Sequence, residues 1–134
     1  DRVLPPFWSR KNPVDAVASS DSNAYYQAVE GALASKEYDM AMLIGYGILS
    51  SIAIPALNTT DVEWAQRIAE LVSAHRKPLF IVDVLGIDQS ESARAFERAG
   101  IPVYGTVRSA VMAAAQMVKY SEYRERKEAT MPRG

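Results

Sequence analysis

The chain has 134 residues, of which 49% are apolar and 23% are charged. This length suits one domain, and the composition is that of a globular protein rather than of a disordered chain. Fifteen basic and sixteen acidic side chains give a net charge of -1, so nucleic acid and other polyanions are not expected as partners.

The first predicted elements are a helix over Ser22–Ser35 and a strand over Met40–Ile44. In the helix, Tyr26, Val29 and Leu33 fall on one side, as they do in a helix that packs against a core. The strand is a short, continuous apolar run, which is typical of a strand that is buried on both faces of a parallel sheet.

A second helix and a second strand follow. The helix is predicted over Asp61–Arg76, and Thr60 and Glu63 are placed to form a capping box at its start. The strand is predicted over Leu79–Val84, again as a continuous apolar run.

The last third of the chain repeats the pattern. Asp88 is placed to cap a helix that runs to Ala99, and Ile101–Tyr104 is predicted as a short third strand. Thr106 is placed to cap the last helix. The mixed charges of Glu122–Glu128 lack an apolar stripe, so we expect a frayed helix end or a tail there.

This alternation of strands and helices predicts an α/β fold with one parallel sheet and helices on its faces. Any ligand is then expected beyond the carboxyl ends of the strands. Three strands make a thin sheet, and a strand over Met40–Ile44 at its edge would lie unpaired. We therefore expect a further strand upstream.

Several classes of protein are not expected. The absence of cysteine excludes a disulfide framework and a thiolate metal site. The longest apolar run, Ile52–Leu57, is interrupted by Pro55 and is far shorter than the roughly 20 residues that span a bilayer. With no export signal in the sequence, we expect a cytoplasmic protein without a membrane partner.

An ordered set of short motifs resembles a known family. The motifs are Leu4-Pro5-Pro6-Phe7, Asn12-Pro13-Val14-Asp15, Tyr38-Asp39, Lys77-Pro78-Leu79 and Ala99-Gly100-Ile101-Pro102-Val103-Tyr104. In this order they resemble the flavodoxin-like ligase domain of the NDP-forming acyl-CoA synthetases, such as ADP-forming acetate-CoA ligase, which are similar to succinyl-CoA synthetases. The resemblance covers roughly residues 4–120.

The resemblance implies a flavodoxin-like, three-layer domain over residues 1–120, truncated at its N-terminus, with a charged C-terminal tail over residues 121–134. The family interconverts acyl-CoA, ADP and phosphate with the free acid, CoA and ATP through a phosphohistidine. That histidine lies on another domain, and CoA, ADP or ATP, and magnesium bind to other parts of the complete enzyme. The chain is therefore expected to bind no cofactor and to have no activity alone, and its implied partners are the other domains or subunits of the synthetase.

By the same resemblance, the loop after the strand over Met40–Ile44 faces the phosphohistidine. The matching residues here are Gly45, Tyr46, Gly47 and Ile48. Backbone N–H groups in a glycine-containing loop suit a phosphate, and we predict a phosphate-binding role for these four residues. The alternative is that the two glycines only turn the chain away from the strand.

Three further polar residues are candidates for lining the same site. Asn12 and Asp15 belong to the family signature, although turn formation around Pro13 is the interpretation we favour. Asp83 ends the second strand, and capping or exposure to solvent is favoured for it. His75, the only histidine, lies at a helix end on the opposite side of the sheet and is interpreted as a helix-end residue. No catalytic residue and no metal ligand is predicted.

A second function from a different class stays open. The chain would then be a non-catalytic flavodoxin-like module for protein interaction or oligomerisation, which the hydrophobic stretch Gly45–Leu57 favours. Under either function we expect a homo-oligomer, because an unpaired strand and the apolar segment Ile48–Leu57 need to be covered.

Overall fold

The computed structural model describes residues 11–15, 22–46, 58–83 and 90–130. In chain order the elements are α1 (Ser22–Ala34), β1 (Ala41–Ile44), α3 (Asn58–His75), β2 (Leu79–Val82), α4 (Glu91–Arg98), β3 (Val103–Tyr104) and α5 (Val107–Thr130). The three strands form one parallel sheet in the order β1-β2-β3. The predicted α/β fold with a parallel sheet is therefore confirmed.

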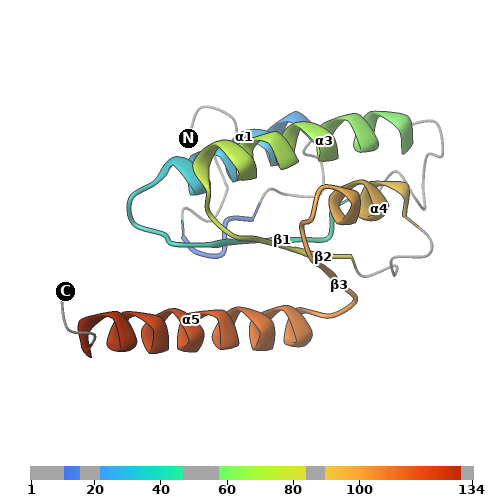
Figure 1. The fold of residues 1–134 in the computed structure, drawn as a ribbon. Coiled ribbons are helices and arrows are strands. Elements are labelled where there is room, and N and C mark those ends of the chain that lie inside the picture. The colour runs from blue at the N-terminus through green and yellow to red at the C-terminus, as the bar shows by residue number, and fades with distance from the viewer. Residues whose placement is uncertain (1–10, 16–21, 47–57, 84–89, 131–134) are drawn as a thin grey trace.

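The sheet lies between two layers of helices. Helices α1, α3 and α4 cover one face, and α5 lies on the other (Figure 1). Each helix between two strands carries the chain to the next strand along the sheet, as right-handed crossovers do. The result is a three-layer arrangement that is consistent with part of a flavodoxin-like fold.

The larger part of the core lies between the sheet and the three helices. Leu33 of α1, Ile68 of α3 and Phe96 of α4 are almost completely buried against Leu43 and Ile81 of the sheet. Burying one such side chain stabilises the fold by roughly 1.5–3 kcal/mol. This cluster is the main source of stability in the described part of the chain.

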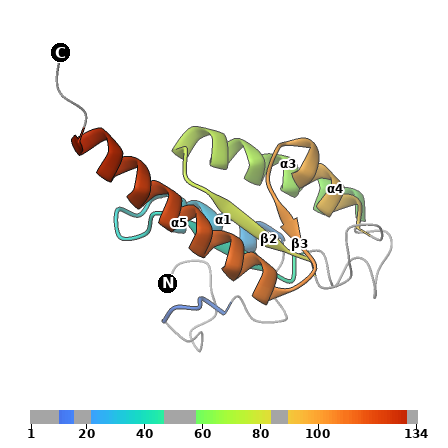
Figure 2. The same cartoon turned by 60° about the horizontal axis from the view of Figure 1, so that its bottom comes forward.

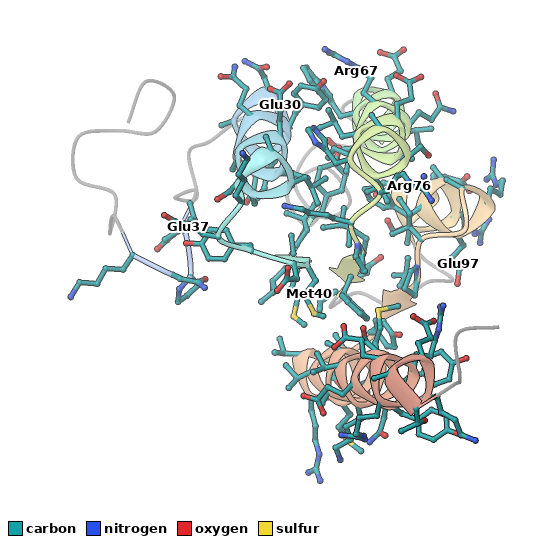
Figure 3. The ribbon with its side chains drawn as sticks, turned by 60° about the vertical axis from the view of Figure 1, so that its left-hand side comes forward. Glu30, Glu37, Met40, Arg67, Arg76 and Glu97 are labelled. Atoms are coloured by element: carbon teal, nitrogen blue, oxygen red, sulfur yellow. The ribbon has the colours of Figure 1, made fainter. Side chains whose placement is uncertain are left out.

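A smaller cluster lies on the α5 side of the sheet. Phe80 and Val82 of β2 pack against Ala110 of α5, and Met40 and Met42 contact the same cluster. Figure 3 shows the side chain of Met40 between the sheet and α5. The continuous apolar runs of the strands therefore arise because residues of alternating direction meet helices on both faces.

The start of α4 differs from the prediction. Ser90, and not Asp88, is the N-cap, and its Oγ accepts a hydrogen bond of 3.1 Å from the N–H of Ala93. Asp88 itself lies outside the described residues. The helix ends at Arg98, and Gly100 shortly after it has a φ of 77°, a conformation that glycine adopts without strain and other residues do not.

Helix α3 also begins earlier than predicted. It starts at Asn58, so Thr60 lies inside the first turn and is not the N-cap of the predicted capping box. It ends at His75, one residue before the predicted end at Arg76, and His75 lies at the helix end that precedes the amino end of β2, as predicted. Arg76 then adopts a φ of 54°, which is a left-handed conformation at a helix end.

Helix α5 is the longest element, with 24 residues. As predicted, Thr106 caps it, since its Oγ1 accepts a hydrogen bond of 3.1 Å from the N–H of Ser109. The helix continues through Glu122–Glu128 to Thr130 and projects well past the sheet (Figure 2). The domain boundary predicted at residue 120 therefore falls within a continuous helix, and it stays a prediction.

Candidate functional site

The carboxyl ends of the three strands form one edge of the sheet. One residue directly follows each strand at this edge: Gly45 after β1, Asp83 after β2 and Gly105 after β3. The N–H of Gly45 donates to the carbonyl of Val82 at 2.9 Å, and the N–H of Asp83 donates to the carbonyl of Tyr104 at 2.9 Å. The pairing therefore places the three residues in a row at the edge where parallel α/β sheets bind ligands.

Gly45 turns the chain away from β1. Its φ of 78° lies in the left-handed region, which a glycine adopts without strain. Because its N–H is already used in the sheet, a phosphate here would depend on N–H groups of the residues that follow. Among these, Gly47 and Ile48 lie outside the described residues, so the phosphate-binding role of the loop stays a prediction.

Tyr46 anchors this turn to the core. Its side chain is only 3% exposed, and its hydroxyl donates a hydrogen bond of 3.0 Å to the carbonyl oxygen of Asp61. The ring also contacts the rings of Tyr25, at a centroid distance of 6.0 Å, and of Phe96, at 5.5 Å. These contacts tie the residue after Gly45 to α1, α3 and α4, so its side chain serves to position the loop.

Asp83 is buried at the same edge. Asp83 is 2% exposed, so of the two interpretations favoured for it, exposure to solvent is wrong, while capping stays a prediction. The reason is tertiary, because Asp83 follows β2, the central strand, which lies between β1 and β3. A buried carboxylate costs free energy unless it has partners, and such groups concentrate at functional sites. Its role in lining the site stays a prediction, and its burial is consistent with that role.

The segment that holds Asn12 and Asp15 is exposed. The peptide bond between Asn12 and Pro13 is cis, and turn formation around Pro13 stays a prediction. Burial raises the pKa of the Tyr25 hydroxyl, and the negative charge of Asp15 raises it further. Asp15 therefore lies close to Tyr25, whose ring contacts Tyr46. Tyr25 thus connects Asp15 with Tyr46, and the site-lining role of Asn12 and Asp15 stays a prediction.

Two residues of this region were not singled out from the sequence. Tyr25 connects Asp15 with Tyr46, but in the sequence it is only one of two adjacent tyrosines in a helix. Gly105 ends β3 as Gly45 ends β1, and this shared pattern of a strand followed by glycine is a signal that was present in the sequence.

Other kinds of site find little support in the described residues. Within residues 11–15, 22–46, 58–83 and 90–130, no three side chains of the types that bind metals lie together. No helix in the described part of the chain is both long and apolar enough to cross a membrane.

Comparison with known proteins finds two related ligases. The sequence is 31% identical, over 127 residues, to the alpha subunit of the ADP-forming acetate-CoA ligase I of Pyrococcus furiosus. It is 24% identical, over 124 residues, to the ADP-forming 4-hydroxybutyrate-CoA ligase of Nitrosopumilus maritimus. The matches cover 90% and 92% of this chain. The chain is related to a segment of the ADP-forming CoA ligases.

These ligases are much longer than the chain. The matches span 25% of the Pyrococcus subunit and 16% of the Nitrosopumilus enzyme. No family model matches the chain, and no solved structure does so either. The resemblance predicted from the ordered motifs is thus confirmed by two ADP-forming CoA ligases, for one segment of each.

Proposed function

We propose that the chain is a domain of an ADP-forming acyl-CoA ligase and supplies one wall of its phosphate site. The complete enzyme would interconvert acyl-CoA, ADP and phosphate with the free acid, CoA and ATP through a phosphohistidine on another domain. The single observation that carries the proposal is the relation of nearly the whole chain to one segment of such ligases.

The row at the carboxyl edge of the sheet supports this location. Gly45 and Asp83 lie side by side there, and Tyr46 fixes the position at which the loop leaves β1. A loop that is fixed at its start can hold N–H groups in place for a phosphate, which removes part of the entropic cost of binding. The role of this chain is then to bind and orient, while the groups that react belong to other domains.

The experiment uses a hybrid ligase. This chain replaces the matching segment in the alpha subunit of the Pyrococcus ligase, and the complete enzyme is then assayed for ADP formation that depends on acetate and CoA. The proposal predicts turnover. A hybrid that folds but shows no turnover would contradict it.

A matched pair of variants tests the loop. Gly47→Asp brings a negative charge to the proposed phosphate wall and is expected to lower turnover by about tenfold or more. Gly31→Asp adds the same charge on α1, at a position where an added Cβ meets nothing within 4 Å, and turnover should change by no more than about twofold. Equal effects of the two variants would remove the loop from the mechanism.

One observation favours the non-catalytic alternative. The N–H of Gly45 and the side chain of Tyr46 are both used within the fold, which leaves fewer donors for a phosphate. Under this alternative the domain contributes a surface and no contact to phosphate. A well-folded hybrid that assembles without turnover would favour it.

A further inference from the structure

Arg67 lies over two aromatic rings at the contact between α1 and α3. Its guanidinium carbon is 4.1 Å from the centre of the Trp64 ring and 4.7 Å from the centre of the Tyr26 ring. The two rings contact each other, with their centroids 5.4 Å apart. Because Trp64 belongs to α3 and Tyr26 to α1, both helices contribute to the surface that holds the guanidinium.

These ring contacts take the place of the ion pairs that arginines form elsewhere in the molecule. On α4, for example, Arg94 pairs with Glu91 at 3.0 Å. Glu63 and Glu70 lie one turn before and one turn after Arg67 on α3, at spacings that favour such pairs. Nevertheless, in the part of the chain that the structure describes, no ion pair joins Arg67 to a carboxylate.

The guanidinium of Arg67 is therefore prepared to bind a carboxylate from outside. Its N–H donors form a planar fork that matches the two oxygens of a carboxylate. Contacts with two rings hold the side chain in place, which lowers the entropic cost of binding. Trp, Tyr and Arg are also the residue types that contribute most at protein interfaces. Arg67 with Trp64 and Tyr26 has the composition of the centre of such an interface.

Carboxylates lie on the same face of the helix layer. Figure 3 shows Glu30 of α1 and Arg67 of α3 on the side that points away from the sheet, which we call the outer face. Glu30 follows Tyr26 by one turn, and Glu63 and Glu70 flank Arg67. Arg67 and the three glutamates are all exposed. The outer face thus presents an arginine and carboxylates together, which makes it complementary to itself in a two-fold pair.

We propose that the outer face of α1 and α3 binds a second copy of this chain, with Arg67 of each copy bound to Glu30 of the other. A two-fold axis that runs along the helices, between α1 and α3, lays α1 of one copy over α3 of its partner. Glu30 then lies within about one helical turn of the partner's Arg67, because Tyr26, one turn from Glu30, contacts Arg67 within its own copy. The charge pair forms twice.

The size of the outer face predicts a weak pair. Helix α1 has 13 residues and α3 has 18, so the face is about 20–27 Å long and, with two helices side by side, about 20 Å wide. Each copy then buries roughly 400–500 Å², which is near the lower limit for specific pairs. We therefore expect a dissociation constant on the order of 100 μM, with the two charge pairs fixing the orientation.

Sedimentation velocity of the 134-residue chain, at concentrations up to about 1 mM, tests for this pair. The proposal predicts a dimer whose dissociation constant rises about threefold or more from about 50 mM to about 500 mM salt, because salt screens exposed charges. Association through the apolar segment Ile48–Leu57, which the sequence led us to expect, would not weaken with salt. A monomer at every concentration, or a dimer that salt does not weaken, would overturn the proposal.

Exchanging the charges tests the two residues directly. Arg67→Glu and Glu30→Arg each bring like charges together twice, so each should raise the dissociation constant by about tenfold or more. An equimolar mixture of the two variants restores opposite charges at both contacts. Its dissociation constant should return to within about threefold of that of the unchanged chain. A mixture that stays monomeric would contradict the pairing of Arg67 with Glu30.

A control variant separates binding from a role within the fold. Arg98→Glu makes the same change of charge on α4, where the side chain of Arg98 is 69% exposed, and it should change the dissociation constant by no more than about twofold. If Arg67 only holds α1 against α3, Arg67→Glu lowers the melting temperature and Glu30→Arg leaves the dimer unchanged, which overturns the proposal. Glu30→Arg alters an exposed residue, so its effect on the dimer decides even if Arg67→Glu does not fold.

This inference goes beyond the proposed function and does not depend on it. The measurements use the chain without other parts of a ligase. A hybrid ligase without turnover would leave the pairing of Arg67 with Glu30 intact, and a monomeric chain would leave the proposed function intact.

Discussion

At the scale of single residues, Tyr46 fixes the start of the loop that follows β1. Its hydroxyl is buried and donates to the carbonyl oxygen of Asp61, so Tyr46→Phe removes one buried hydrogen bond while keeping the ring. We expect the free energy of unfolding to fall by about 1 kcal/mol. Urea denaturation measures this change. Tyr120→Phe is the control, because Tyr120 is 64% exposed and its substitution should leave stability unchanged.

Tyr25 makes the stability of the folded chain depend on pH in the alkaline range. Its pKa in the folded state is raised above the ordinary value of 10.0, by burial first and by the charge of Asp15 second. Above pH 10 the unfolded chain releases this proton more readily than the folded chain, so stability falls as the pH rises from there toward the raised pKa. Below pH 10 both states keep the proton and the effect vanishes.

Two variants separate the causes of this shift. Tyr25→Phe should make the loss of stability above pH 10 smaller, as measured by urea denaturation across that range. Asp15→Asn should lower the pKa of Tyr25, as followed by NMR of the tyrosine ring, while leaving it raised because burial remains. An unchanged pKa in Asp15→Asn would show that Asp15 does not lie near Tyr25.

At the scale of elements, most of the fold was predictable from the sequence because local signals sufficed. The apolar runs Met40–Ile44 and Leu79–Val84 predict strands, and the structure has strands over Ala41–Ile44 and Leu79–Val82. The predicted burial holds along β2, whereas Ile44 of β1 is 47% exposed. Thr106 is a helix cap in both sequence and structure. The start of α4 was not predictable in this way. Asp88 and Ser90 are both good caps, and only packing decides for Ser90, which is buried.

The candidate site was predictable in its location and less so in its details. Strand order alone places Gly45 and Asp83 at one edge. The burial of Asp83 and the anchoring of Tyr46 to α3 depend on contacts between elements that are far apart in the sequence. Such contacts leave no local pattern, so the sequence analysis favoured capping or exposure to solvent for Asp83.

Helix α5 allows a direct test of the domain boundary predicted at residue 120. Every described residue from 121 to 130 is exposed, so a chain that ends after Tyr120 should lose less than about 0.5 kcal/mol of its free energy of unfolding. A chain that ends after Thr106 is the contrasting variant. It exposes Phe80 and Val82 and should lose at least about 2 kcal/mol. Urea denaturation compares the two, and a large loss in the longer chain would contradict the boundary.

At the scale of the whole molecule, the two layers of helices differ in how firmly they are held. Phe96, Leu33 and Ile68 bind three helices to one face of the sheet through a large cluster. On the other face, Ala110 is the only residue of α5 that is fully buried. We therefore expect α5 to separate from the sheet more easily than the rest of the molecule unfolds.

Native-state hydrogen exchange in low concentrations of urea tests this difference. The amides of α5 after Ala114 should open with a free energy at least about 1–2 kcal/mol lower than the amides of β2, because few buried contacts hold this part of the helix. Ala110→Gly should lower the opening free energy of α5 by roughly 1 kcal/mol through its effect on the helix. The opening free energy of Phe80 to Val82 should then fall less than that of α5, since the larger cluster on the opposite face remains. Equal opening free energies for α5 and β2, shifted equally by Ala110→Gly, would show instead that both layers unfold as one cooperative unit.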